Sequence, residues 1–220
     1  IDGEAENDYS SNTSGISLSS NGKVVAIGAP YNDGNGTNSG HVRVYEWDDS
    51  SWNQLGSDID GEAAGDLSGN SVSLSSDGSI VAIGAYGNDG NGSNSGHVRV
   101  YEWDSGNSSW IQKGNDIDGE ATDDQSGRSV SLSSDGTIIA IGAHRHNANG
   151  SNFGHVRVYK WNGSSWVQRG NDIDGEAAED FSGYSVSLTS DGTIVAIGAI
   201  KNDGNGSNAG HVRIYEWSGT

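Results

Sequence analysis

Polar and apolar residues alternate along a stretch of eight residues that occurs four times in the chain. It reads GHVRVYEW at 40–47 and 96–103, GHVRVYKW at 154–161, and GHVRIYEW at 210–217. Successive side chains of a β-strand point to opposite faces, so alternate residues from His41 to Trp47 share one face and Val42 and Val44 lie on the other. Each copy is therefore predicted to be a β-strand.

The second copy shows the pattern of a whole unit. SVSLSS at 71–76 alternates, and Asp77-Gly78 follows it as a hairpin turn. IVAIGA at 80–85 is nearly continuous in apolar residues, which is typical of a strand covered on both faces, and its small residues let neighbours approach closely. After GHVRVYEW, SSWIQKGNDI at 108–117 is expected to form a fourth, outer strand anchored by Trp110. Four antiparallel strands per unit are typical of a β-propeller blade.

The pentapeptide IDGEA marks the start of each unit, at Ile1, Ile59, Ile117 and Ile173. A fixed period of this size indicates a tandem-repeat architecture. We therefore expect a single all-β repeat domain over 1–220, a β-propeller-like array of four-stranded antiparallel blades with units 1–58, 59–116, 117–172 and 173–220. The last unit lacks the SSW strand, so the array is expected to be open or to continue, either along the chain or into an adjacent subunit.

VAIGAP, the loop NDGNGTNSG and GHVRVYEW follow one another in the first copy. This order resembles the FG-GAP repeat, which builds the propeller of integrin α-subunits and many bacterial and algal extracellular proteins. The resemblance extends over all four copies, although Ser68 and Ser182 stand where the family has Phe, and only the first copy keeps its proline, Pro30. It implies a propeller fold and an extracellular or cell-surface location.

Composition narrows the range of partners. Thirty acidic and eleven basic residues give a formal charge of −19, which disfavours nucleic acids and anionic membrane surfaces and favours cations or basic surfaces. The sequence contains no apolar run of the ~20 residues that a membrane span needs, so no membrane insertion is expected. It also contains no cysteine. The first residue is Ile1, which suggests a piece of a longer or processed polypeptide.

Calcium is the cofactor to consider, although none is expected to be required. The two-residue turns such as Asp77-Gly78 offer too few oxygens for the integrin-type site that the resemblance would imply, because calcium takes six to eight ligands. The longer loops retain one carboxylate each, at Asp33, Asp89 and Asp203, whereas the third copy has Asn147. These loops are either calcium sites or turns that tolerate change, and the substitution in the third copy favours turns.

Seven Asn-X-Ser/Thr triplets would accept N-linked glycans in a eukaryotic secretory protein. The alternative is that a chain rich in Asn, Gly and Ser produces such triplets by chance, because Asn-Gly is also a favoured turn. The candidate acceptors are Asn12, Asn35, Asn91, Asn107, Asn149, Asn162 and Asn205.

The histidines and arginines of the recurring strand are predicted to pack between blades. A buried charge must be paired, so each Arg is expected to meet a carboxylate such as Asp60 or Glu62 of an adjoining IDGEA segment. His144 and His146 occur only in the third copy. One interpretation is that this pair contacts a ligand or a transition metal, and the plainer one is that it belongs to a variable loop tip. The predicted inter-blade residues are His41, Arg43, His97, Arg99, His155, Arg157, His211 and Arg213, with Trp47, Trp103, Trp161 and Trp217.

No arrangement of catalytic residues emerges from the sequence. It contains no cysteine and no Gly-x-Ser-x-Gly motif, and acidic pairs that recur in every unit are unlike a single active site. We therefore expect a non-enzymatic extracellular structural or adhesive protein, in a glycosylated surface layer or fibril, whose partners are further copies of itself or extracellular proteins and glycans. The alternative is a carbohydrate-binding propeller with one shallow site per unit, formed by the variable positions after Gly-Ala: Pro30-Tyr31, Tyr86-Gly87, His144-Arg145 and Ile200-Lys201.

Overall fold

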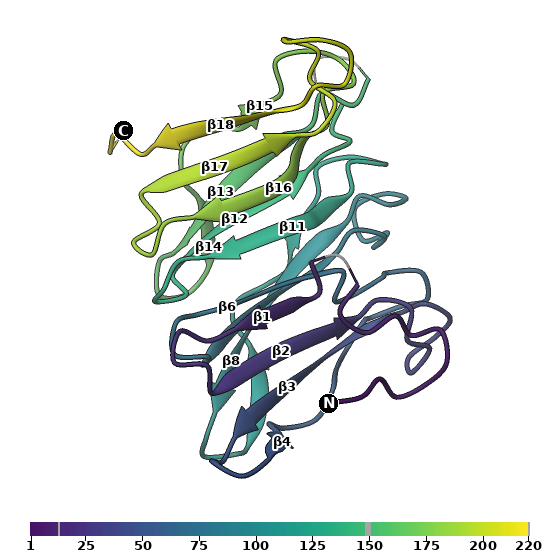
Figure 1. Ribbon diagram of the computed structural model, residues 1–220, viewed down its shortest axis with the longest axis vertical. Helices are drawn as coiled ribbons and strands as arrows, with labels where there is room; N and C mark the ends of the chain where they lie inside the picture. Colours follow the sequence, from purple (N-terminus) through teal and green to yellow (C-terminus); the bar gives the residue numbers. More distant parts are fainter. Residues whose placement is uncertain (13, 148–150, 220) are drawn as a thin grey trace.

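The structure, a computed structural model, describes residues 1–12, 14–147 and 151–219, and these residues form strands, turns and loops without a helix. Four antiparallel sheets succeed one another along the long axis (Figure 1). The first sheet contains β1 (Ile16–Leu18), β2 (Val24–Ala29), β3 (His41–Trp47), β4 (Trp52–Gln54) and β5 (Ile59–Asp60). The second contains β6 (Ser71–Leu74), β7 (Ile80–Ala85), β8 (His97–Asp104), β9 (Ser109–Gln112) and β10 (Ile117–Asp118).

The third and fourth sheets repeat this order. The third contains β11 (Ser126–Leu132), β12 (Ile138–Ala143), β13 (His155–Trp161), β14 (Trp166–Gln168) and β15 (Ile173–Asp174). The fourth, within the described residues, contains β16 (Ser182–Leu188), β17 (Ile194–Ala199) and β18 (His211–Glu216). The all-β array of antiparallel blades predicted from the repeat is thus present, and the ring is not closed.

The predicted fourth strand is two short strands. In the second sheet β9 pairs with β8 through Gln112 and Tyr101, and β10 pairs with the same edge of β8 through Ile117 and Val98. Four residues separate Gln112 from Ile117 where only two separate Tyr101 from Val98, so the outer chain bulges between the two pairings. The second half of this strand is the beginning of IDGEA, which therefore completes one sheet before the chain crosses to the next.

Apolar clusters lie between consecutive sheets. The cluster between the first and second sheets includes Val42 and Val44 of β3, and Val81 and Ile83 of β7, all with at most 1% of their surface exposed. Both faces of the middle strands are therefore buried, as the continuous apolar run of IVAIGA predicts. Equivalent clusters lie at the next two junctions.

The first strands of the sheets lie side by side at the inner edge of the array. Serine hydroxyls join them: the amide of Leu74 donates to Ser17 of the preceding sheet at 2.9 Å, and the amide of Leu132 donates to Ser73 at 3.0 Å. The polar positions of SVSL thus satisfy the free edge of the next strand. Gly84 lies so close to the backbone of Gly127 in the next sheet that a β-carbon would overlap its carbonyl oxygen.

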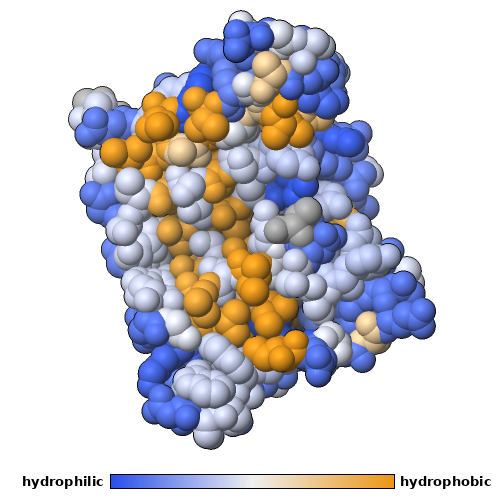
Figure 2. Space-filling model, in the orientation of Figure 1, coloured by the Kyte–Doolittle hydropathy of each residue, from blue (hydrophilic) through white to orange (hydrophobic). Residues whose placement is uncertain are grey.

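Both end faces of the array are open. Val212 and Ile214 of β18 are 67% and 71% exposed, whereas their equivalents Val98 and Val100 are 0% and 2% exposed. At the other end Ile16 and Leu18 of β1 are 57% and 58% exposed. Figure 2 shows apolar surface near both ends of the array. In the described residues no helix is long and apolar enough to cross a bilayer.

Candidate functional site

A pocket of about 450 Å³ lies where the chain leaves the second strand of each sheet. Each sheet contributes residues from the first two positions after its Gly-Ala: Tyr31, Tyr86, His144-Arg145 and Ile200-Lys201 all line it. They belong to the variable positions predicted for one carbohydrate site per unit, of which Pro30 and Gly87 do not line the pocket. The structure instead brings them together in one shared site, which we call the axial pocket.

The axial pocket combines cations with aromatic rings. Arg128, Arg145 and Lys201 line it, and they are three of only eleven basic residues in a strongly acidic chain. The guanidinium of Arg128 lies 4.5 Å from the ring centre of Tyr184 and donates a hydrogen bond of 2.8 Å to its hydroxyl. Such cation–aromatic contacts hold the side chain in place while part of its charge faces the pocket. The arrangement suits an anionic ligand with a flat or ring-shaped body.

His144 forms part of the wall of this pocket. It is 5% exposed and packs edge-on against Tyr184, with ring centres 5.4 Å apart. Burial, with the nearby charges of Arg128 and Arg145, lowers its pKa to about 3, so the ring is neutral at physiological pH. The loop-tip interpretation of His144 and His146 is wrong, because both side chains are buried.

The histidines and arginines of the recurring strand lie at the junctions between sheets. Arg99 donates a hydrogen bond of 2.6 Å to the carbonyl of Asp60 and lies 3.8 Å from the carboxylate of Glu62. The partner at Asp60 is therefore the backbone rather than the side chain. Arg157 and Arg213 make the same contacts with the third and fourth IDGEA segments. Arg43 does so with Asp2 and Glu4, so the first IDGEA covers the outer part of the first sheet's free face.

The histidines on these strands are buried to different degrees. His41, His97 and His155 are each 1% exposed, and His211, at the open end, is less buried. Burial and the neighbouring Arg99 lower the pKa of His97 despite the carboxylates of Asp116 and Glu62. The neutral form of His97 is thus favoured, and this ring fills space at its junction without requiring a counter-charge.

The tryptophans at the ends of these strands contact the preceding sheet. A β-carbon on Gly56 would lie 2.8 Å from the ring of Trp103, and Gly114 and Gly170 are in equally close contact with Trp161 and Trp217. Within its own sheet Trp47 pairs with Trp52 at 5.6 Å between ring centres, as Trp103 pairs with Trp110 and Trp161 with Trp166. Trp110, predicted as the anchor of the outer strand, also donates a hydrogen bond of 2.8 Å from its indole to the carbonyl of Leu55 across the junction.

The carboxylates of the long loops close those loops. Asp33 accepts a hydrogen bond of 2.8 Å from the backbone amide of Asn38. Asp89 and Asp203 accept the equivalent bonds from the backbone amides of Asn94 and Asn208. In the third copy the amide oxygen of Asn147 accepts the equivalent bond from Asn152 at 2.7 Å. This shared role explains why an amide replaces the carboxylate there. Calcium binding in these loops stays a prediction.

The candidate glycan acceptors differ in what their side chains contact. Asn35 and Asn91 donate hydrogen bonds of 2.8 Å to the carbonyls of Gly61 and Gly119, which tie their loops to the next IDGEA segment. Among the described residues, the side chains of Asn107 and Asn162 bond within their own turns, and Asn205 is exposed. Asn12 is partly buried beside the axial pocket, and Asn149 lies outside the described residues.

These features define a class: an open β-propeller-type repeat protein whose blades are stacked antiparallel sheets. The chain belongs to the FG-GAP repeat family, whose model matches residues 59–101, 116–159 and 173–215, more than half of the sequence. The matches begin at or next to the second, third and fourth IDGEA segments. Comparison with curated proteins gives no match.

Two solved structures are similar in fold. One is a proposed 6-phosphogluconolactonase from Bacteroides fragilis, with a TM-score of 0.51, 10% identity, and coverage of 73% of this chain and 38% of that one. The other is TolB from Acinetobacter baumannii, with a TM-score of 0.49, 15% identity, and coverage of 92% of this chain and 40% of that one. The chain therefore spans about two fifths of the length of each.

Proposed function

We propose that this chain is a non-enzymatic, extracellular structural or adhesive repeat protein that assembles end to end through its two open sheet faces. The observation that carries the proposal is the match between those faces and the internal junctions. Val212 and Ile214 stand where Val98 and Val100 pack against the next sheet, and Ile16 and Leu18 stand where Val72 and Leu74 receive such a sheet. A second copy would bury both faces as the internal junctions do.

Charge limits how strongly two copies attract each other. Each chain carries a formal charge of −19, so copies repel one another at long range, and this repulsion weakens as salt screens it. The attraction comes from apolar side chains, whose contribution does not depend on charge. Association is therefore expected to increase with ionic strength, which is the opposite of an interface held by ion pairs.

Sedimentation velocity over a range of protein and salt concentrations tests the assembly. The wild type is expected to form a concentration-dependent series of species, and Ile214→Lys is expected to remain monomeric with an unchanged melting temperature, because Ile214 is exposed. Val167→Lys is the matched control, since Val167 is 48% exposed on the outer strand β14, away from both end faces. A wild type that stays monomeric at all concentrations, or association that Ile214→Lys leaves intact, would refute the proposal.

A second candidate function is supported by the axial pocket: binding of an acidic carbohydrate. The convergence of three cations with tyrosine rings from different sheets favours a sugar ring that bears a carboxylate or sulfate. This site would recruit a glycan to the axial pocket that all four sheets share, away from the two end faces, and is compatible with the adhesive role.

A glycan array with neutral, carboxylated and sulfated sugars tests this binding. Acidic sugars are expected to bind, and Arg128→Met is expected to abolish the signal, whereas Lys23→Met, at an exposed turn outside the pocket, is expected to retain it. Binding of neutral sugars alone, or of none, would contradict this second function and leave the assembly proposal unaffected.

A further inference from the structure

One position sets the third copy apart from the other three. Asn32, Asn88 and Asn202 each donate an amide hydrogen bond to a buried aspartate, at 3.0, 3.2 and 2.9 Å. In the third copy this position is His146, and its Nδ1 lies 3.0 Å from the carboxylate of Asp124, the equivalent aspartate. An imidazole has thus replaced an amide without loss of the carboxylate contact.

The contact with Asp124 determines what the other nitrogen of His146 can do. Asp124 is 1% exposed, and its ionised carboxylate can only accept, so the contact favours the tautomer of His146 with its proton on Nδ1. Nε2 then carries a free lone pair. A histidine whose second nitrogen donates to a buried carboxylate is the usual arrangement of a metal-binding histidine.

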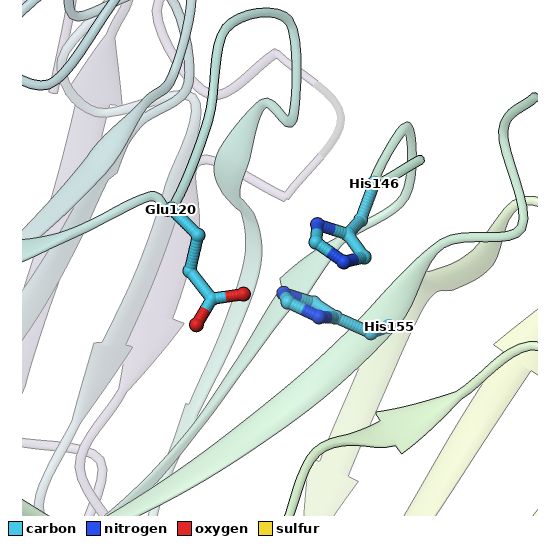
Figure 3. A group of neighbouring side chains, drawn as sticks. All are labelled: Glu120, His146 and His155. Atoms are coloured by element: carbon cyan, nitrogen blue, oxygen red, sulfur yellow. The ribbon is translucent and has the colours of Figure 1, made fainter. Parts of the chain in front are cut away.

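His155 supplies a second imidazole at the same place. It is 1% exposed, and neither of its ring nitrogens has a hydrogen-bond partner among the described residues. Its ring lies almost parallel to that of His146, with centres 3.9 Å apart. In Figure 3 the two rings are stacked and the carboxylate of Glu120 faces their edge. One potential ligand atom from each of the three residues lies within 4.8 Å of the others.

We propose that Glu120, His146 and His155 bind a divalent transition-metal ion, with Zn²⁺ as the reference ion, at the junction between the second and third sheets. Two imidazole nitrogens with one carboxylate form a donor set that suits Zn²⁺, and it leaves at least one position for water. Ca²⁺ and Mg²⁺ prefer oxygen donors and do not fit this set.

The site must adjust to close on an ion. Zinc–nitrogen bonds of about 2.1 Å bring two bound nitrogens to roughly 3.4 Å from each other. Ligand atoms that are now up to 4.8 Å apart must therefore approach by up to about 1.4 Å, and the almost parallel rings must tilt so that both lone pairs point at the ion. Glu120 contacts Arg157 at 3.3 Å through Oε1, which leaves Oε2 for the metal. The positive charge of Arg157 opposes the ion, and the carboxylates of Glu120, Asp124 and Asp172 offset it, the last at 3.8 Å from His155.

The other copies supply the control. The first and second copies have equivalent clusters with a single histidine each, Glu4–His41–Asp58 and Glu62–His97–Asp116. His146→Asn converts the third copy to the sequence pattern of the rest and is therefore expected to fold. Asn88→His builds the second imidazole into the second copy, beside His97, with Asp66 in place of Asp124.

Isothermal titration with Zn²⁺, and visible absorption with Co²⁺, test the proposal on the purified chain. The wild type is expected to bind one ion, His146→Asn none, and Asn88→His two, with melting curves showing that both variants are folded. A Zn²⁺ affinity of His146→Asn equal to that of the wild type, or a wild type that binds no Zn²⁺, would overturn the assignment, as would Ca²⁺ binding at the same site in competition with Zn²⁺.

Discussion

Gly84→Ala should separate two neighbouring blades at their inner edge. An added β-carbon would lie 3.0 Å from the carbonyl carbon of Gly127 and overlap its oxygen, whereas carbon atoms in contact are about 3.5–4.0 Å apart. The strands must therefore move apart by several tenths of an ångström or more in a close-packed interior. Overpacking of this kind costs about 1–3 kcal/mol.

Gly198→Ala is the matched control, because Gly198 occupies the same position in the fourth sheet. Among the described residues its added β-carbon would approach only Ser185, an exposed side chain whose hydroxyl can rotate. Alanine in a strand loses less conformational entropy than glycine, so this variant should be unchanged or up to about 1 kcal/mol more stable.

Thermal and urea unfolding of the two variants at low protein concentration measure the difference. Gly84→Ala should lower the melting temperature by roughly 2–12 °C, and Gly198→Ala should not lower it. Equal stability of the two variants would mean that the inner strands of the second and third sheets do not touch, and the stacking of blades described above would be wrong.

Three further predictions concern single side chains. His144→Phe should remove part of the loss of folding stability at acid pH. The pKa of His144 is about 3 in the folded state and about 6.5 in the unfolded state, so the unfolded state binds the proton more tightly. The free energy of unfolding therefore falls as pH drops through this window, by about 2 kcal/mol at pH 5. Urea midpoints at pH 7 and 5 would show it, and an equal loss in the variant would contradict it. Asp89→Asn should leave both the melting temperature and any calcium affinity unchanged, because Asn147 makes the same loop bond; weaker calcium binding on titration would identify a metal site instead. In a eukaryotic secretory host, glycopeptide mass spectrometry should find Asn205 modified and Asn35 unmodified, since the Asn35 amide is bonded to Gly61; full occupancy of Asn35 would mean that this bond is dispensable.

Local pattern was sufficient to predict most of the strands. Continuous apolar runs such as IVAIGA and the alternation from His41 to Trp47 determine which residues are extended and buried, and β7 occupies the predicted residues. The outer strand was predicted as continuous because sequence does not show that the outer chain bulges away from β8 between its two pairings. The break at residues 113–116 is a property of the pairing and not of the segment itself.

The sites were harder to predict because they depend on how sheets are arranged relative to one another. The variable positions after Gly-Ala were recognised, but their convergence on one pocket follows from the curvature of the array. His146 and Asp124 are 22 residues apart, and only the loop of the third copy brings that imidazole over His155. The substitution of Asn by His in one copy was the one signal in the sequence that pointed to this cluster.

Amide hydrogen exchange at several protein concentrations tests most directly whether each sheet depends on a neighbour to cover its faces. At low concentration the amides of β18 and β1 are expected to exchange much faster than those of β8, and their protection should rise with concentration while that of β8 stays constant. Protection of β18 equal to that of β8 in dilute solution, or protection that does not change with concentration at either end, would contradict the account.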